Sequence, residues 1–191
     1  MATLPVNPFA SGAALSTAPP QLQPQAEKAA WPWYAIRTRS KCERLATTAL
    51  ENNGYESYLP VYRSRRRWSD RVVSIDAPLF PGYVFCRFNS QHRLPVITSP
   101  GVVDIIGFAN EPAPIPDQEI EAVQTVLNSG LAAEPFPFLR EGQRVRVTHG
   151  ALKDVEGILV KKKADWRLVV SVEILQRSVS VEFDGDCVTH L

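Results

Sequence analysis

The residues with the clearest chemical potential form an arginine cluster around a tryptophan, in the segment SRRRWSDR at positions 64–71. Arg65, Arg66 and Arg67 directly precede Trp68. Guanidinium groups bind phosphate oxygens through paired N–H donors, and an aromatic ring that stacks on an unpaired base contributes about 1–3 kcal/mol per base. The cluster therefore predicts contact with a nucleic acid. A solubilising loop is the alternative interpretation.

A second basic group surrounds an expected helix. Ser40 and Glu43 have the spacing of a capping box, which predicts a helix start, and Asn53-Gly54 predicts its end. Apolar residues at helical spacing should face inward: Cys42, Leu45, Ala46, Ala49 and Leu50. Polar residues at the remaining positions and at the preceding strand end are candidates for reading DNA bases: Arg39, Lys41, Arg44 and Thr48. An ordinary solvated helix face is the alternative.

The third candidate feature is an aromatic stretch, APLFPGYVFCRF, at positions 77–88. Pro81-Gly82 interrupts it, and a bend there would bring Phe80, Tyr83 and Phe85 onto one surface. An exposed aromatic patch of this kind is typical of a protein-binding hot spot. A core strand preceded by a turn is the alternative.

Catalytic and metal chemistry have little support in the sequence. The three histidines, at positions 92, 149 and 190, lie far apart, and neither a phosphate-binding glycine loop nor a nucleophile elbow is present. The three cysteines lack CxxC spacing, so neither a disulfide framework nor a zinc site is expected. We therefore expect a binding protein without enzymatic activity, metal or cofactor, in a reducing cytoplasm.

Bulk composition is that of a globular protein, with 191 residues, 45% hydrophobic residues and a formal net charge of +1. This length suits two small domains. Apolar runs are shorter than the roughly 18 residues of a membrane span, and the N-terminus lacks the order of a secretory signal. We expect a soluble monomer without membrane association.

The first expected domain covers residues 31–128, after a tail at 1–30 that is rich in Pro, Ala, Ser and Gln and is expected to be disordered. Its expected strands are residues 33–38, 58–62, 72–75, 77–88 and 102–108, with the arginine cluster at a hairpin tip and the fourth strand paired with the third. A further helix should begin at the N-cap Asp117 and end at Gly130, with an apolar face of Ile120, Val123 and Leu127. This order predicts an α+β sandwich, with helices packed against an antiparallel sheet.

The second expected domain covers residues 140–191 and follows a proline-containing linker at 129–139. It contains five short β-branched runs separated by turn residues. Five strands in about fifty residues predict a small β-barrel.

Together these features resemble the NusG family of transcription elongation and antitermination factors, over residues 33–191. The resemblance rests on WYAIRT with its helix, on LFPGYVF and on PIPDQEIEAV. It also rests on a KOW motif made of Gly142, Val145, Val147, Gly150, Leu152, Gly157 and Val160. The family has an N-terminal NGN domain that binds RNA polymerase and a C-terminal KOW barrel, of SH3-like fold, that recruits another factor. The WSDR hairpin followed by APLFPGY is similar to the specialised, operon-directed members.

The resemblance implies three sets of site residues. The tip of the polymerase clamp helices would bind an aromatic hollow formed by Phe80, Pro81, Tyr83 and Phe85. The gate loop across the cleft would meet His92, Arg93 and Leu94. The barrel would dock a partner through Leu152, Val155, Ile174 and Leu175.

The implied function is suppression of pausing and termination by a factor that holds the clamp closed, with non-template DNA meeting the basic helix or the arginine hairpin. The barrel's expected partner is Rho or the small-subunit ribosomal protein NusE, although Leu175-Gln176 stands where the housekeeping factor has Phe-Gly. One alternative is an RNA- or ribosome-binding KOW protein that uses Lys161 to Lys163 and Arg167 without polymerase. An enzyme with an unrecognised site is the other.

Overall fold

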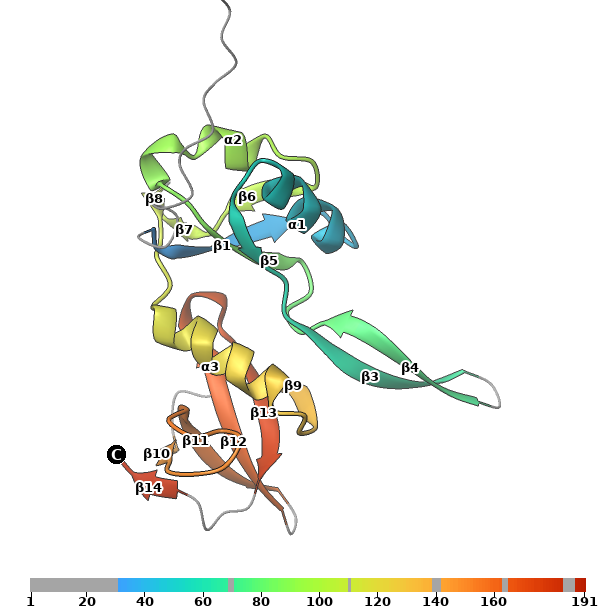
Figure 1. The fold of residues 1–191 in the computed structure, drawn as a ribbon, viewed down its shortest axis with the longest axis vertical. Coiled ribbons are helices and arrows are strands. Elements are labelled where there is room, and N and C mark those ends of the chain that lie inside the picture. The colour runs from blue at the N-terminus through green and yellow to red at the C-terminus, as the bar shows by residue number, and fades with distance from the viewer. Residues whose placement is uncertain (1–30, 69–70, 110, 139–141, 163–164, 184–187) are drawn as a thin grey trace, which may run out of the picture.

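The computed structural model describes residues 31–68, 71–109, 111–138, 142–162, 165–183 and 188–191 (Figure 1). The tail expected at residues 1–30 lies outside this part of the chain. Within the described residues, no helix is both long and apolar enough to span a membrane.

An antiparallel sheet forms the upper part of the molecule, in the order β2-β5-β1-β6 (Figure 1). Its strands are β1 (Trp33–Thr38), β2 (Glu56–Tyr58), β5 (Tyr83–Arg87) and β6 (Val102–Ile105). Because side chains alternate along a strand, Tyr34 and Ile36 of β1 lie on one face, where they form a core with Ala46 and Leu50 of helix α1 (Glu43–Asn52). The other face carries Trp33, whose side chain belongs to a second core.

A long two-stranded hairpin, β3 (Val61–Trp68) and β4 (Arg71–Pro78), projects from this body (Figure 1). One expectation was wrong here: the strand after the Pro-Gly turn, β5, pairs with β1 and β2, whereas it was predicted to pair with the preceding strand. The predicted hairpin is present with longer strands than expected, and the backbone of Arg65–Trp68 lies in β3, paired with β4 up to Trp68 and Arg71.

Short elements complete the upper part. They are a 3-10 turn at Ser90–His92, α2 (Leu94–Ile97), and the small hairpin β7 (Gly107–Phe108) and β8 (Glu111–Pro112). Pro95 lies in the first turn of α2, where a missing N–H costs no helical hydrogen bond.

The lower part is a six-stranded sheet, in the order β14-β10-β11-β12-β13-β9. Five of its strands are those predicted from the β-branched runs: β10 (Gln143–Val147), β11 (Glu156–Lys162), β12 (Asp165–Val172), β13 (Arg177–Phe183) and β14 (Val188–His190). The sixth, β9 (Ala133–Pro137), comes from the segment expected to be a linker and pairs with β13.

Helix α3 (Asp117–Asn128) packs against β12, so it lies beside the barrel, whereas the element order predicted it on the upper sheet (Figure 1). Its buried residues are Ile120, Val123 and Val126, and Leu127 is half-buried. One continuous apolar cluster includes these side chains, Trp33 and Phe85 of the upper sheet and the barrel interior. The two parts of the chain therefore share a core in this structure.

Both long helices begin differently from the prediction. The residue before α1 is Cys42, and it makes no side-chain capping bond to the described residues, so the capping box of Ser40 and Glu43 is not formed. Lys41 lies in the preceding turn, at φ 62°, and Leu45, expected inward, is 54% exposed. Asp117 is the first residue of α3 where an N-cap was predicted, and its carboxylate accepts a hydrogen bond from Arg87 at 3.0 Å.

Candidate protein and nucleic-acid interface

The Pro81-Gly82 bend is a β-turn held from both sides. Its own bond runs from the Tyr83 N–H to the Phe80 carbonyl, at 3.1 Å, and Gly82 adopts φ +85°, the value that a type II turn requires at its third position. The Gly82 carbonyl accepts a hydrogen bond from the Thr38 N–H at 2.9 Å. The Gly82 N–H donates to Oε1 of Glu43 at 2.8 Å. The turn is thereby tied to both β1 and α1.

Two of the four aromatic-hollow residues are buried. Phe80 is 1% exposed and Phe85 is 0% exposed, and their rings meet edge to face with centroids 6.0 Å apart. The expectation that these two rings form an exposed patch is wrong in this structure, because the apolar cluster that joins the sheet to the barrel covers them. Pro81 is exposed and Tyr83 is half-buried.

The barrel contacts the turn through Tyr83. The Arg177 guanidinium of β13 stands 5.6 Å from the Tyr83 ring centroid, in cation–π geometry. Tyr58 stacks on Phe85, with ring centroids 6.3 Å apart. Burial raises the pKa of the Tyr58 hydroxyl to about 12, so this phenol stays neutral throughout the physiological range.

The expected gate-loop residues lie at the surface. His92 ends the 3-10 turn and Leu94 begins α2; both are exposed, Leu94 to 71%, and Arg93 between them is half-buried. The turn is stabilised by Asn89, whose side-chain oxygen accepts a hydrogen bond from the Gln91 N–H at 2.9 Å. An exposed leucine on a short, anchored element is compatible with protein contact.

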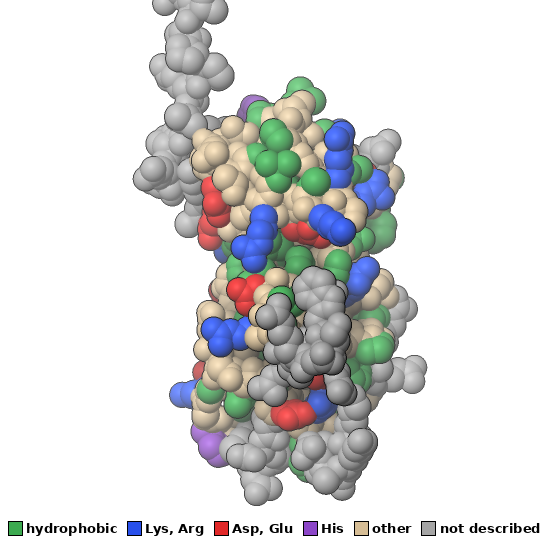
Figure 2. All heavy atoms as spheres, turned by 90° about the vertical axis from the view of Figure 1, so that its right-hand side faces the viewer, with side chains coloured by type: hydrophobic (Ala, Val, Ile, Leu, Met, Phe, Trp, Pro, Cys, Tyr) green, Lys and Arg blue, Asp and Glu red, His purple; other side chains and the backbone are tan. Residues whose placement is uncertain are grey.

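The basic group around α1 is at the surface as predicted. Arg39, Lys41, Arg44 and Thr48 are all exposed, although Arg39 and Lys41 precede the helix. Figure 2 shows several Lys and Arg side chains on the upper part of the face that bears the hairpin. The side chains of Arg65, Arg66, Arg67 and Trp68, which were predicted to bind nucleic acid, lie outside the described part of the chain.

The residues expected to dock a partner on the barrel are mostly interior. Leu152, Val155 and Leu175 are buried in the shared core, and Ile174 is half-buried against it. The expectation that these apolar side chains form a surface patch is therefore wrong for the first three. Leu152 and Val155 lie in the connection between β10 and β11, and Leu175 lies in the 3-10 turn Glu173–Leu175, from which all three pack into the shared core.

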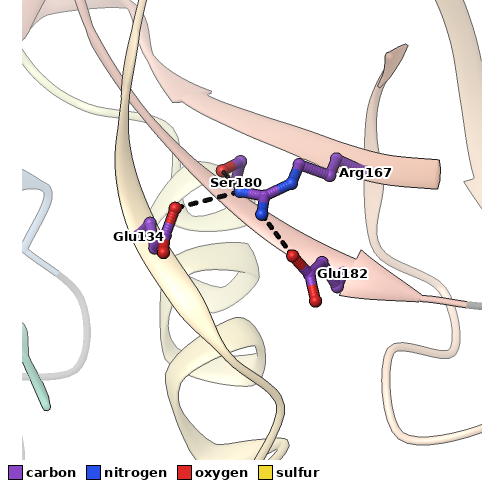
Figure 3. A network of polar contacts seen from close by, with 4 residues as sticks. All are labelled: Glu134, Arg167, Ser180 and Glu182. Atoms are coloured by element: carbon purple, nitrogen blue, oxygen red, sulfur yellow. Dashed lines mark hydrogen bonds and ion pairs between the residues drawn. The ribbon is translucent and has the colours of Figure 1, made fainter. Parts of the chain in front are cut away.

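Arg167 is the centre of a polar network that ties β9 to the barrel (Figure 3). Its Nη1 donates to Glu134 Oε2 of β9 at 3.0 Å and to Ser180 Oγ of β13 at 3.3 Å, and its Nη2 bonds to Glu182. The residue is buried, and two carboxylates neutralise its charge. Arg167 was a candidate RNA contact; in this structure its guanidinium is occupied within the protein.

The described residues offer no support for a nucleophilic cysteine or a metal site. Burial raises the pKa of the Cys86 thiol to about 12, which keeps it protonated and unreactive. Among the described residues, no group of three or more His, Cys, Asp or Glu side chains could hold a metal ion.

Comparison with known proteins places this arrangement in a family. The family profile described as "Transcription termination factor nusG" matches residues 32–124, which contain β1, α1 and the Phe80–Tyr83 turn. The Escherichia coli K12 protein "Transcription termination/antitermination protein NusG" is 30% identical over 168 residues, which cover 80% of this chain and 92% of that protein. This chain belongs to the NusG family. The NusG of Yersinia pestis is 32% identical, with the same two coverages.

Among solved structures, "Domain interaction in Thermotoga maritima NusG" aligns with 84% of this NusG-family chain and 97% of its own, at 20% identity and a TM-score of 0.49.

Sequence reasoning missed three residues that shape this NusG-family surface: Glu43, Glu134 and Arg177. Glu43 was interpreted as a capping-box glutamate, because its spacing from Ser40 fits that motif. Glu134 directly precedes the two prolines of a predicted linker, and Arg177 lies at a strand end, so neither had a local signal. The spatial partners of all three are distant in sequence, and only the fold brings them together.

Proposed function

We propose that this chain is a transcription elongation and antitermination factor that binds RNA polymerase through the surface around the Phe80–Tyr83 turn. The observation that carries the proposal is the doubly anchored turn, in a chain that is 30% identical over 80% of its length to a NusG protein. A rigid turn that presents Pro81 and Tyr83 is suited to bind a protein helix tip, since little conformational entropy is lost on binding.

The division of labour follows the family resemblance: residues 31–128 as the NGN domain and 140–191 as the KOW domain, joined by residues 129–139, of which Ala133–Pro137 form β9 of the barrel sheet. Contact with the clamp helices through the turn and with the gate loop through His92, Arg93 and Leu94 would bridge the cleft. A factor that binds the closed clamp better than the open one shifts the population toward closure and opposes pausing.

The barrel covers part of this surface, since Arg177 stands over Tyr83 and the core cluster is shared. A polymerase helix that reaches Phe80 and Phe85 therefore displaces the barrel, and the measured affinity includes the free energy of that opening. The freed barrel would recruit Rho or the ribosomal protein NusE, with half-buried Ile174 as the most accessible of the predicted docking residues. The alternative function, RNA binding through the barrel, has less support from Arg167, because its guanidinium bonds to Glu134 and Glu182.

Replacing Tyr83 by alanine should weaken binding to purified core RNA polymerase by about 1–3 kcal/mol, the loss expected for one hot-spot ring. Affinity is measured by titration of labelled protein with polymerase. Phe108→Ala is the matched control, because Phe108 is an aromatic side chain that is 73% exposed on a different hairpin. Wild-type protein that fails to bind polymerase, or equal losses in both variants, would contradict the proposed function.

The two basic groups should contribute differently to DNA binding in a paused complex. Alanine at Arg65, Arg66 and Arg67 should weaken binding to all sequences alike and lower the salt slope by about 0.7 per lost phosphate contact. Alanine at Arg39, Lys41 and Arg44 should instead flatten the preference among non-template sequences, because these exposed donors share one rigid surface at the start of α1.

The measurement is affinity for complexes with native or scrambled non-template strands across a salt series. Lys153→Ala, an exposed lysine on the barrel, is the control. A β3 arginine variant that loses only sequence preference would reverse the assignment.

A further inference from the structure

We propose that Glu43 is the positioning residue of the candidate polymerase interface: its carboxylate fixes the Phe80–Tyr83 turn against α1. This inference rests on the proposed function, and it assigns to Glu43 a role that its capping-box spacing does not suggest.

The hydrogen-bond pattern of the turn creates the need for such a residue. The turn's internal bond uses the Tyr83 N–H and the Phe80 carbonyl, so both polar atoms of the Gly82 backbone require other partners. The Gly82 carbonyl accepts a hydrogen bond from the Thr38 N–H at 2.9 Å. The Gly82 N–H donates a hydrogen bond to the Glu43 carboxylate at 2.8 Å, and Glu43 lies 39 positions earlier in the chain.

Glu43 is suited to this role by its place in the fold. The residue is only 7% exposed, so its carboxylate is largely removed from solvent. It lies in the first turn of α1, where the helix dipole stabilises a negative charge. A hydrogen bond from a backbone N–H to a carboxylate is stronger than one between neutral groups.

Packing alone does not locate the turn. Beyond Gly82 itself and its two chain neighbours, no described atom lies within 4 Å of the position that a Cβ on Gly82 would occupy, and Pro81 is exposed. Phe80 and Phe85, on either side, are held in the core. The two hydrogen bonds of Gly82 therefore set the position of the exposed Pro81 and of Gly82 relative to the ends of the turn, which packing holds in place.

The test compares Glu43→Ala, Glu43→Gln and Glu43→Asp in the full chain. Amide hydrogen exchange at Gly82 reports on the turn, and affinity for core RNA polymerase reports on the interface. Glu51→Ala is the control, because Glu51 is an exposed carboxylate on the same helix, and it accepts a hydrogen bond from the nearby Ser57 Oγ.

Glu43→Ala should raise Gly82 exchange and weaken polymerase binding, each by about tenfold, the effect of losing one charge-assisted hydrogen bond. Exchange within α1 and β1 should stay unchanged. Glu43→Gln should recover most of both properties, because its amide oxygen still accepts the Gly82 N–H. Glu43→Asp, whose side chain is one methylene shorter, should resemble Glu43→Ala and keeps the test available if that variant does not fold.

Unchanged Gly82 exchange in a folded Glu43→Ala or Glu43→Asp variant would overturn the proposal. So would faster exchange with wild-type affinity, or faster exchange spread evenly over α1, which marks a purely structural role. Failure of the wild-type chain to bind polymerase would remove the proposed function instead, and the exchange data would still report whether Glu43 holds the turn.

Discussion

Replacing Phe85 by alanine should lower the free energy of unfolding by about 3–5 kcal/mol, the range for truncating a buried phenylalanine. The ring is fully buried, meets Phe80 edge to face and stacks on Tyr58, so its removal leaves a cavity between the sheet and the barrel. Urea unfolding followed by far-ultraviolet circular dichroism measures the change. Polymerase binding should fall in proportion to the folded fraction that is lost.

Tyr83→Ala distinguishes an effect on stability from an effect on binding, because Tyr83 is half-buried and lies next to core residues of the same strand. It should cost less stability than Phe85→Ala while affecting polymerase affinity directly. A Phe85→Ala variant that keeps its stability but loses affinity would mean that the Phe85 ring is available to partners in solution, as the sequence alone suggested.

Replacing Gly157 by valine should destabilise the barrel by about 3 kcal/mol, at the upper end for overpacking. A Cβ at Gly157 would stand 2.6 Å from the Val169 carbonyl oxygen and 3.0 Å from Leu168 Cδ1, so β11 and β12 would have to separate. Hydrogen exchange resolved by residue is the appropriate measurement. Protection should fall in β11 and β12 more than in β1 and β5.

Gly150→Ala provides the comparison for that variant. Gly150 has φ +90° and no described atom within 4 Å of a Cβ, so alanine there meets only backbone strain, about 1–2 kcal/mol. Equal destabilisation by the two substitutions would show that the contact with Val169 does not limit the β11–β12 pairing.

The elements that sequence reasoning located were those with a strong local pattern. The barrel strands β10 to β14 were predicted from their β-branched runs, and α1 from its helical spacing. The strand β9 was missed because Pro135 and Pro137 indicate a linker, and its pairing with β13 depends on a surface distant in sequence. The pairing of β5 with β1 was missed for the same reason. A turn in the sequence favours pairing with the preceding strand, whereas the observed pairing is set by which strand faces are buried.

The exposure of the candidate site residues was predicted only in part. Pro81 is exposed as expected and Tyr83 is half-buried, whereas Phe80 and Phe85 are buried. An aromatic residue on a strand fits a core and a docking surface equally well, and only the packing of α3 and the barrel on that strand decides between them. The role of Glu43 required the Gly82 N–H, a partner that no sequence spacing reveals.

The prolines of β9 have a consequence for how the protein behaves at high concentration. β9 is the last strand of its sheet, and its residues 134, 135 and 137 are exposed. Pro135 and Pro137 are two positions apart, so their nitrogens face the same edge, and neither carries a hydrogen to donate. An incoming strand from another molecule would find that edge short of donors, which disfavours edge-to-edge aggregation and fibre growth.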